Sequence, residues 1–587
     1  MKTVEKRVWR QSDGQRLQLL KITQDVVMPN DDSDLADWFR DANAGRQVTH
    51  YEARGITYAS GNRWDDPTLA TSYGADPFDA TTFKRVSWQT YLPIPYGGIG
   101  WRDGDGKNIN SGDIRDFGAA MDEDCGLLDV FTPRMGRGGN LPVIVEIHGG
   151  GHAKQPRTLP RFQGDRMRTV FVAVEFPLST FGWFSSNHLG GAHQPNVAYQ
   201  YMVAALQWVQ DNIAEFGGDP DTVLLTGASS GGADCIHLIP SSAGLFHRVL
   251  AHDCGGGGNR PSNYYIKQLG DEFWARLRKD RPAWGSKYET IAEVATRGGI
   301  GLALRLGPSP SKILAWGNER TGYTFANGDY TTETRGDVNR WPVRDGTFVA
   351  NDTALQEVIA NRWPTDMPVW ITWAANEASA HDDGAGDITP YLARCGIDTD
   401  EEIAHCRDVL FYKRLDAIGD KWQRQAVGYS IYGYFADRMI REHTANGGRG
   451  WVGYFDWRTA ANGSERPGHA SQVAYFNRKP WWQASQGATA NTSRLTAGDL
   501  LMAEHLARSA IAFAKDGDPA SDYIAPDDPG LFLPEHYETF ETWAEYGAGQ
   551  NVNVIRNDFR EPTRPAVVVG PGPHTDARDY FDGTIGY

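Results

Sequence analysis

Residues 222–232 constrain the fold more strongly than any other part of the chain. The apolar run 222–225 is followed by Thr-Gly-Ala-Ser-Ser-Gly-Gly, which places Ser229 between Gly227 and Gly231. Glycines at these two positions let a strand and the helix after it approach closely, and they force the serine into a strained turn. The segment therefore predicts a buried strand that turns sharply into a helix. This is the form of a nucleophile elbow, with Ser229 as the nucleophile.

The composition excludes several classes of partner. The chain has 587 residues, 40% of them hydrophobic, and a formal net charge of -16. Nucleic acids and anionic lipid surfaces require a basic patch, and none is visible, so we expect neither partner. The charged N-terminus has no signal-like apolar core, and no stretch approaches the roughly twenty apolar residues of a membrane span. We expect a cytoplasmic protein whose oligomeric state the sequence leaves open.

The five cysteines, at a low density in this chain, agree with that location. An odd number leaves at least one thiol unpaired. Cys395 and Cys406 are close enough in sequence to form a disulfide in an exported protein, so this pairing stays open.

Strand and helix patterns alternate along the chain. Near-continuous apolar runs predict buried strands, and apolar positions at helical spacing predict helices. The expected strands are 141–147, 169–174, 222–225, 368–373 and 450–456, and the expected helices are 196–216 and 500–515. Such alternation predicts an α/β protein with a mostly parallel sheet covered by helices on both faces.

Five short motifs stand out along the chain. These motifs are Asn-Ile-Ala-Glu-Phe-Gly-Gly-Asp-Pro at 212–220, Glu-Asp-Cys-Gly-Leu-Leu-Asp-Val at 123–130, His-Gly-Gly-Gly at 148–151, Gly-Ile-Thr-Tyr-Ala at 55–59 and Ala-Phe-Ala-Lys-Asp-Gly-Asp-Pro at 512–519. Together they resemble the type-B carboxylesterases and cholinesterases, and the resemblance spans roughly residues 50 to 550. It implies an α/β-hydrolase fold with inserted helical and loop cap regions in a single domain, 1–587. Within that domain we expect an N-terminal extension at 1–45, a catalytic core at 46–555 and a surface tail at 556–587.

A serine nucleophile needs an imidazole base and a carboxylate that orients this base. In this fold the chain order is serine, acid, histidine. Glu377 follows an apolar strand where the family carries its glutamate, with Asp382 and Asp383 as the alternatives. His469 lies in a segment similar to the family's histidine motif, although Gln472 replaces the acidic residue of that motif. The expected triad is Ser229, Glu377 and His469.

By the same resemblance, the backbone N–H groups of Gly150, Gly151 and Ser230 form an oxyanion hole. Four further residues are candidates for a substrate pocket, with core packing as the plainer alternative: His152, Phe181, Trp183 and Phe184. The resemblance implies no metal and no cofactor.

The chain also departs from the family. Ala228 replaces the elbow glutamate, and the family's arginine is missing from 174–184. Loss of both partners predicts that another packing arrangement replaces a structural ion pair of the family. Asp234 stands where a small residue is expected, and we predict a hydrogen-bond partner for it, with Glu175 as the candidate.

Three functions follow from these residues. The first is hydrolysis of a small-molecule carboxylic ester through an acyl-enzyme intermediate. The second uses the same groups on an amide or carbamate, or transfers the acyl group, or closes a ring in a specialised metabolite; the long segment 83–121 leaves room for a dedicated substrate. The third is a catalytically inactive esterase-like binding protein, which the intact serine, glutamate and histidine disfavour.

Overall fold

The computed structural model describes most of the expected catalytic core. The described residues are 2–25, 36–37, 40–41, 44–89, 101–102, 108–109, 121–153, 155, 157, 168–185, 195–241, 244–255, 322–326, 329–335, 342–350, 355–380, 399–410, 421–458, 467–477, 496–521, 543–547, 552–557 and 565–570.

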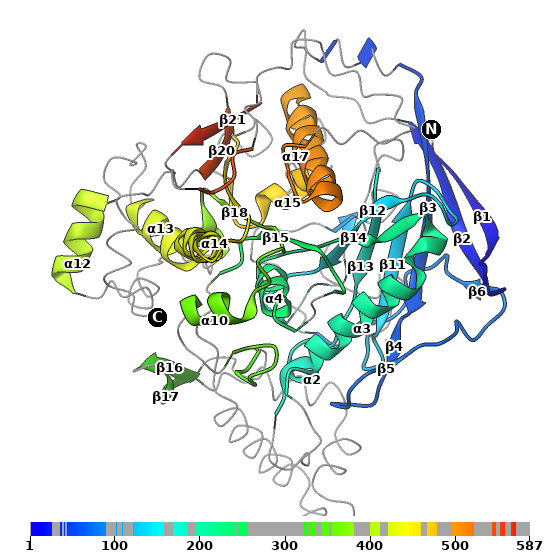
Figure 1. The fold of residues 1–587 in the computed structure, drawn as a ribbon, viewed down its shortest axis with the longest axis horizontal. Coiled ribbons are helices and arrows are strands. Elements are labelled where there is room, and N and C mark those ends of the chain that lie inside the picture. Colours follow the sequence, from blue (N-terminus) through cyan, green and yellow to red (C-terminus); the bar gives the residue numbers. More distant parts are fainter. Residues whose placement is uncertain are drawn as a thin grey trace, which may run out of the picture.

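One large mixed sheet runs through the described part of the molecule (Figure 1). In spatial order its strands are β1 (Lys2–Arg10), β2 (Arg16–Asp25), β3 (Gln47–Thr57), β11 (Leu127–Thr132), β13 (Val170–Val174), β12 (Leu141–Ile147), β14 (Gly218–Ala228), β15 (Arg248–His252), β18 (Val369–Ala374), β19 (Gly450–Asp456), β20 (Val552–Asn557) and β21 (Pro565–Gly570), with β6 (Phe78–Asp79) beside β2. The strands from β13 to β20 are mutually parallel. Antiparallel strands flank them on both sides.

Helices cover both faces of this sheet. The described helices of the chain are α2 (Thr180–Trp183), α3 (Val197–Asn212), η5 (Ile213–Phe216), α4 (Ser230–Leu238), α10 (Leu355–Arg362), η7 (Glu377–Ala380), α12 (Asp400–His405), η8 (Cys406–Leu410), α13 (Lys421–Gly428), η10 (Tyr429–Gly433), α14 (Tyr434–Ala445), α15 (Ser471–Phe476) and α17 (Ala497–Asp516). Four short strand pairs complete the described elements: β4 (Ala59–Ser60) with β5 (Thr68–Leu69), β7 (Val86–Ser87) with β10 (Met121–Asp122), β8 (Trp101–Arg102) with β9 (Asn108–Ile109), and β16 (Gly322–Ala326) with β17 (Asp329–Arg335).

Successive residues of the central strands pack into two separate cores. Val223 and Leu225 of β14 join the core under α3, α4 and α14, whereas Leu224 joins the core under α15 and α17. Figure 1 shows α17 and α15 on one side of the sheet and α2, α3 and α4 on the other. Because side chains of a strand alternate between its faces, a strand covered on both sides must be apolar throughout. This explains the continuous apolar runs in the sequence.

The predicted fold class is confirmed. The strands expected at 141–147 and 450–456 have those bounds, and the other expected strands and helices lie within a few residues of their predicted ends. The helix expected at 196–216 is α3 followed by a short 3-10 turn, η5.

The sheet extends past both expected boundaries of the catalytic core. Residues 1–45, expected as an extension, contribute β1 and β2, which pair with each other and with β3. The boundary expected at 555 falls within β20, and β21 lies in the segment 556–587 that we expected as a tail. Both ends of the chain therefore supply edge strands.

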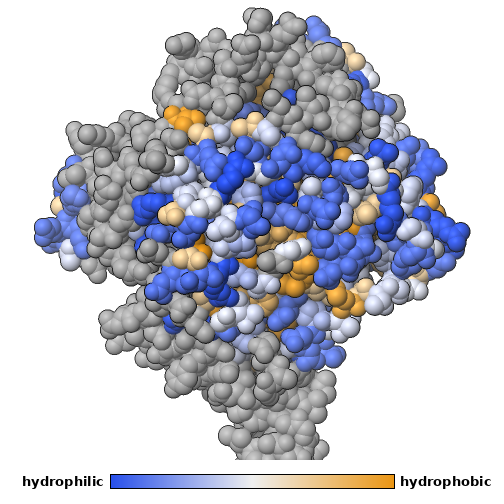
Figure 2. Space-filling view, in the orientation of Figure 1, coloured by the Kyte–Doolittle hydropathy of each residue, from blue (hydrophilic) through white to orange (hydrophobic). Residues whose placement is uncertain are grey.

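The described surface is mainly hydrophilic in the view of Figure 2, with hydrophobic residues gathered near its centre. The large exposed hydrophobic residues among those described are Val4, Val8 and Leu69. Among the described helices, none combines the length and the apolar character that a membrane span needs.

Candidate active site

Ser229 occupies the turn between β14 and α4. Its φ of 59° and ψ of -125° lie in a region that residues with a side chain seldom adopt. Its backbone N–H donates to the carbonyl of His252 at the end of β15, 2.9 Å away. A Cβ atom on Gly227 would lie 2.6 Å from the backbone of Gly231. The turn therefore requires glycine at these positions, as the sequence pattern predicts.

The glycine loop after β12 lies against this turn. A Cβ atom on Gly149 would lie 3.2 Å from the Cβ atom of Ser229. Gly150 and Gly151 have positive φ angles of 103° and 62°, and the N–H of the next residue donates to the hydroxyl of Ser230 at 3.3 Å. The structure thus brings the loop, Ser229 and the first turn of α4 together. That these amides form an oxyanion hole stays a prediction.

Glu377 and His469 come from neighbouring parallel strands. Glu377 begins the turn after β18, and His469 precedes α15 in the segment that follows β19. Asn376 and Gly468 form a parallel bridge that aligns the two segments. His469 Nδ1 lies 2.5 Å from Glu377 Oε2, while the N–H of Ala374 donates to Oε1 at 2.5 Å. A donated Nδ1–H fixes the tautomer in which Nε2 can accept a proton.

Burial controls the protonation of both groups. The Glu377 side chain is fully buried and the His469 side chain is 14% exposed. Burial lowers the pKa of His469, because the charged imidazolium loses hydration. Burial also raises the pKa of Glu377 to about 7, against the effect of its hydrogen bonds. A neutral His469 at neutral pH is the state that a general base needs.

Asp253 is a second acidic group at this site, and it was not predicted from the sequence. It follows β15 with a φ of 49° and is completely buried. Its Oδ1 accepts from the N–H of Ala374 at 3.1 Å and from Gln472 Nε2 at 2.7 Å, and its Oδ2 accepts from the N–H of Ala470 at 3.0 Å. The sequence does contain a signal for Asp253, because it is an acidic residue directly after a short apolar strand. The carboxyl ends of parallel strands meet at one edge of the sheet, so such a residue lies near those that follow the neighbouring strands.

Asp253, Glu377 and His469 also form a group whose ligand atoms lie within 4.8 Å of one another, so they could hold a metal ion. All four carboxylate oxygens, however, already accept hydrogen bonds from N–H groups. Hydrogen bonding accounts for this donor set without a metal ion.

The four candidate pocket residues are buried among aromatic side chains. His152 packs edge to face on Trp183, with ring centroids 4.8 Å apart, and Phe184 stacks on Trp64 at 4.4 Å. Phe181 is 5% exposed and packs near the guanidinium of Arg63. Core packing explains these positions, and a role in substrate binding stays a prediction.

The expected pairing of Asp234 with Glu175 is wrong. Asp234 Oδ1 lies 2.8 Å from His152 Nε2 and accepts from the hydroxyl of Tyr199 at 3.0 Å. The same hydroxyl lies 2.6 Å from His237 Nδ1. Asp234 points from α4 toward α3 and the glycine loop. These hydrogen bonds therefore connect His152, the residue after Gly151, to the buried side chains of α4 and α3.

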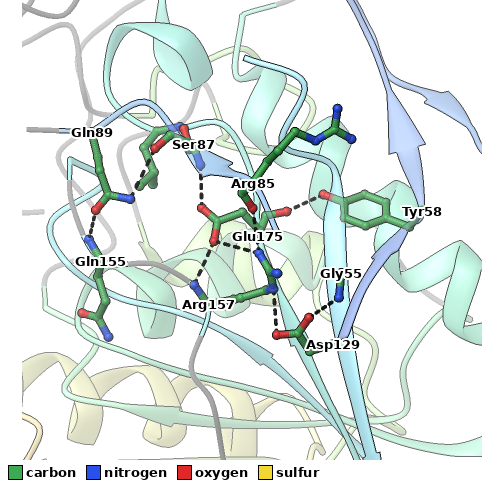
Figure 3. Close-up of polar contacts among 10 residues, drawn as sticks. Gly55, Tyr58, Arg85, Ser87, Gln89, Asp129, Gln155, Arg157 and Glu175 are labelled. Carbon is green, nitrogen blue, oxygen red and sulfur yellow. Dashed lines mark hydrogen bonds and ion pairs between the residues drawn. The ribbon is translucent and has the colours of Figure 1, made fainter. Parts of the chain in front are cut away.

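Glu175 instead belongs to a buried ion-pair cluster (Figure 3). Arg157 is fully buried; its Nε lies 2.9 Å from Asp129 Oδ2, and a terminal nitrogen lies 3.6 Å from Glu175 Oε2. Ser87 donates its backbone N–H to Glu175 Oε1 at 3.0 Å, and Arg157 donates its own to Oε2 at 2.9 Å. Glu175, within the segment from which the family's arginine is missing, is thus held by Arg157 and by two backbone N–H groups.

Three expectations fall on residues outside the described part of the chain. These are the alternative acids Asp382 and Asp383, the Cys395 partner of the open disulfide, and most of the segment 83–121. Three other cysteines, Cys125, Cys235 and Cys254, are buried free thiols.

The strand order, the strained serine and the histidine–carboxylate pair at the carboxyl ends of the strands together define an α/β-hydrolase fold. Residues 40–271 match the carboxylesterase family. The predicted resemblance to this family is confirmed over that segment. It includes the glycine loop and Ser229, whereas Glu377 and His469 lie beyond it.

Similar proteins include carboxylesterase 1F of Mus musculus and cocaine esterase of Homo sapiens. Each is 41% identical over 139 residues, which is 22% of this chain and 24% of the relative. Esterase E4 of Myzus persicae is 32% identical over 225 residues, which is 37% of each chain. The matches thus span about a quarter to a third of these relatives' length.

Proposed function

We propose that the protein hydrolyses small-molecule carboxylic esters through an acyl-enzyme intermediate. One observation carries the proposal. A serine in a strained turn lies against a glycine loop at the sheet edge where a buried glutamate binds a neutral histidine. The names of the similar proteins, which are esterases, support the same reaction class.

In the proposed reaction, Ser229 Oγ attacks the ester carbonyl and His469 Nε2 takes the hydroxyl proton. Glu377 stays ionised and stabilises the imidazolium through Nδ1–H. Backbone N–H groups of Gly150, Gly151 and Ser230 stabilise the oxyanion. His469 then gives its proton to the leaving alcohol. A water molecule repeats the sequence on the acyl-enzyme and releases the acid.

The strained turn contributes by presenting the serine before the substrate arrives. Ser229 cannot relax without loss of its backbone hydrogen bond to His252 and of the close contact between Gly227 and Gly231. The geometry of attack is therefore fixed by the sheet. Holding reactants in place contributes to catalysis because the ordering cost has been met during folding.

The test is hydrolysis of p-nitrophenyl acetate and a bulky aromatic p-nitrophenyl ester by wild type and Ser229→Ala, with labelling by a fluorophosphonate in parallel. We expect turnover and labelling in wild type, and a loss of at least about 10³-fold with no labelling in the variant. Labelling without turnover of any ester would replace hydrolysis by amide cleavage or acyl transfer. No labelling of a folded wild-type protein would overturn the proposal.

A further inference from the structure

Two buried carboxyl groups meet behind His469. Asp253 and Glu377 both accept from the single N–H of Ala374, at 3.1 Å and 2.5 Å. A carboxylate oxygen of Asp253 lies within 4.8 Å of a carboxylate oxygen of Glu377. Within the described part of the chain, neither forms an ion pair with lysine or arginine. Two carboxylates that meet in a buried site without a cation cannot both remain ionised, and they share one proton.

The hydrogen bonds decide which group carries the proton. Glu377 Oε2 accepts the Nδ1–H of His469, a bond that is stronger to an ionised carboxylate. Asp253 has no such partner; its donors are two backbone N–H groups and the neutral amide of Gln472. Burial, and then the nearby charge of Glu377, raise the pKa of Asp253 well above its usual range. Both observations place the proton on Asp253.

We propose that Asp253 is a positioning residue for the reaction, which holds Glu377 in place by donating a shared proton to it. The pair then carries one negative charge, which lies on Glu377 and faces His469. The second carboxyl contributes a hydrogen bond without adding a second charge beside the imidazole. This inference rests on the proposed function.

The surroundings of Asp253 fit this role. Its backbone N–H donates to Thr372 of β18 at 2.8 Å, and its side chain reaches the residue after His469 and the first turn of α15. It therefore joins the segment that carries the acid to the segment that carries the base. The titratable groups that face it from the packed elements are Glu377 and His469, with Cys254 beside it on its own segment.

The experiment compares wild type, Asp253→Asn and Asp253→Ala. Asparagine can donate to Glu377 as a protonated aspartic acid does, although its amide nitrogen cannot accept as the replaced oxygen does, whereas alanine has neither group. We expect kcat to fall about 10- to 100-fold in Asp253→Ala with KM nearly unchanged, and to recover to within a few-fold of wild type in Asp253→Asn. Asp437→Asn is the matched control. Asp437 is another buried aspartate, on α14, and its Oδ1 accepts a hydrogen bond from the hydroxyl of Tyr546 at 2.9 Å. Its substitution should leave kcat unchanged.

The pH profile of kcat/KM shows whether Asp253 is neutral, as the shared proton requires, or carries a second negative charge. If Asp253 is already neutral, the acidic limbs of wild type and Asp253→Asn coincide. If Asp253 is ionised in wild type, Asp253→Asn removes a negative charge beside His469 and lowers the pKa of His469. The acidic limb of the variant then lies about one pH unit or more below that of wild type. That shift would overturn the proposal. Equal loss of kcat in the asparagine and alanine variants, with unfolding temperatures like that of wild type, would overturn it as well.

A measurement of stability makes the inference independent of turnover. A carboxyl whose pKa is raised by folding stabilises the protein fully below its unfolded pKa, and this stability is lost as the pH rises toward the folded pKa. Asparagine does not titrate, so the unfolding temperature of Asp253→Asn should rise relative to wild type between pH 5 and pH 8. If the unfolding temperatures of wild type and Asp253→Asn change in parallel over this pH range, Asp253 does not carry the shared proton and the proposal is wrong. If wild type instead lacks both turnover and fluorophosphonate labelling, the proposed function fails while this curve still decides the state of Asp253.

Discussion

The cluster around Arg157 predicts a large loss of stability from a single substitution in the described core. Arg157→Met removes the cation that pairs with Asp129 and Glu175, and all three side chains are fully buried. Loss of one partner leaves uncompensated charge in the core, which costs about 3–5 kcal/mol of unfolding free energy. Glu175 adds a pH dependence to this loss. Its burial, partly offset by Arg157, raises its pKa to about 7.

The sign of that dependence follows from the raised pKa. Glu175 stabilises the folded state fully below its unfolded pKa, and this contribution disappears as the pH rises through the folded pKa. Without Arg157 the folded pKa rises further, so the loss continues above pH 7. Arg157→Met should therefore be more destabilised at pH 8 than at pH 5, and adding Glu175→Gln should restore part of the stability at pH 8.

Urea unfolding followed by tryptophan fluorescence at the two pH values measures this difference. Arg449→Met is the matched control, because Arg449 pairs with Asp518 and Glu545 while 44% of its side chain is exposed. Exposed ion pairs contribute under about 1 kcal/mol. If Arg157→Met unfolds at the same urea concentration as Arg449→Met, or shows no dependence on pH, the reasoning about buried charge is wrong.

Three further predictions concern the site and the buried thiols. Gly231→Ala should abolish esterase activity and fluorophosphonate labelling, because the new Cβ would collide with the carbonyl of Ile147 and displace the elbow; circular dichroism checks that the fold persists. Activity should fall as the pH drops below about 7, because Glu377, whose pKa burial raises to about 7, then takes up a proton, whereas burial lowers the pKa of His469; an acidic limb well below pH 6.5 would show that Glu377 stays ionised and that His469 alone sets the limb. Maleimide followed by peptide mass spectrometry should leave Cys235 and Cys254 unmodified in the native protein and modify both in urea, because both are buried thiols with pKa values raised by burial; native modification of either would show that the site opens.

The sequence was sufficient for features that depend on neighbours along the chain. The apolar run before Ser229 and the flanking glycines are local, and they predicted both β14 and the turn. Glu377 and His469 could be proposed because each lies in a segment that resembles the family's motif, and the structure brings them into contact. Their catalytic roles stay predictions until the variants are measured.

Features that depend on register across the sheet could not be predicted. Asp253 reaches Glu377 because β15 pairs directly with β18, a pairing that no local pattern encodes. Asp234 was paired with Glu175 on proximity to the elbow, yet the face of α4 on which it lies points to His152. Such contacts are set by which strands neighbour each other and by helix rotation, and both emerge only from the packed core.

The separation of the serine from its base has a consequence for folding. Ser229 follows β14, whereas His469 follows β19, and β15 and β18 lie between these two strands in the sheet. Contacts between segments so distant along the chain form late, because a long loop must close before they stabilise anything. An intermediate could bury most of the strands from β3 to β15 and still lack its base. Recovery of esterase activity during refolding would then report docking of the last parallel strands, and it should lag behind the recovery of secondary structure.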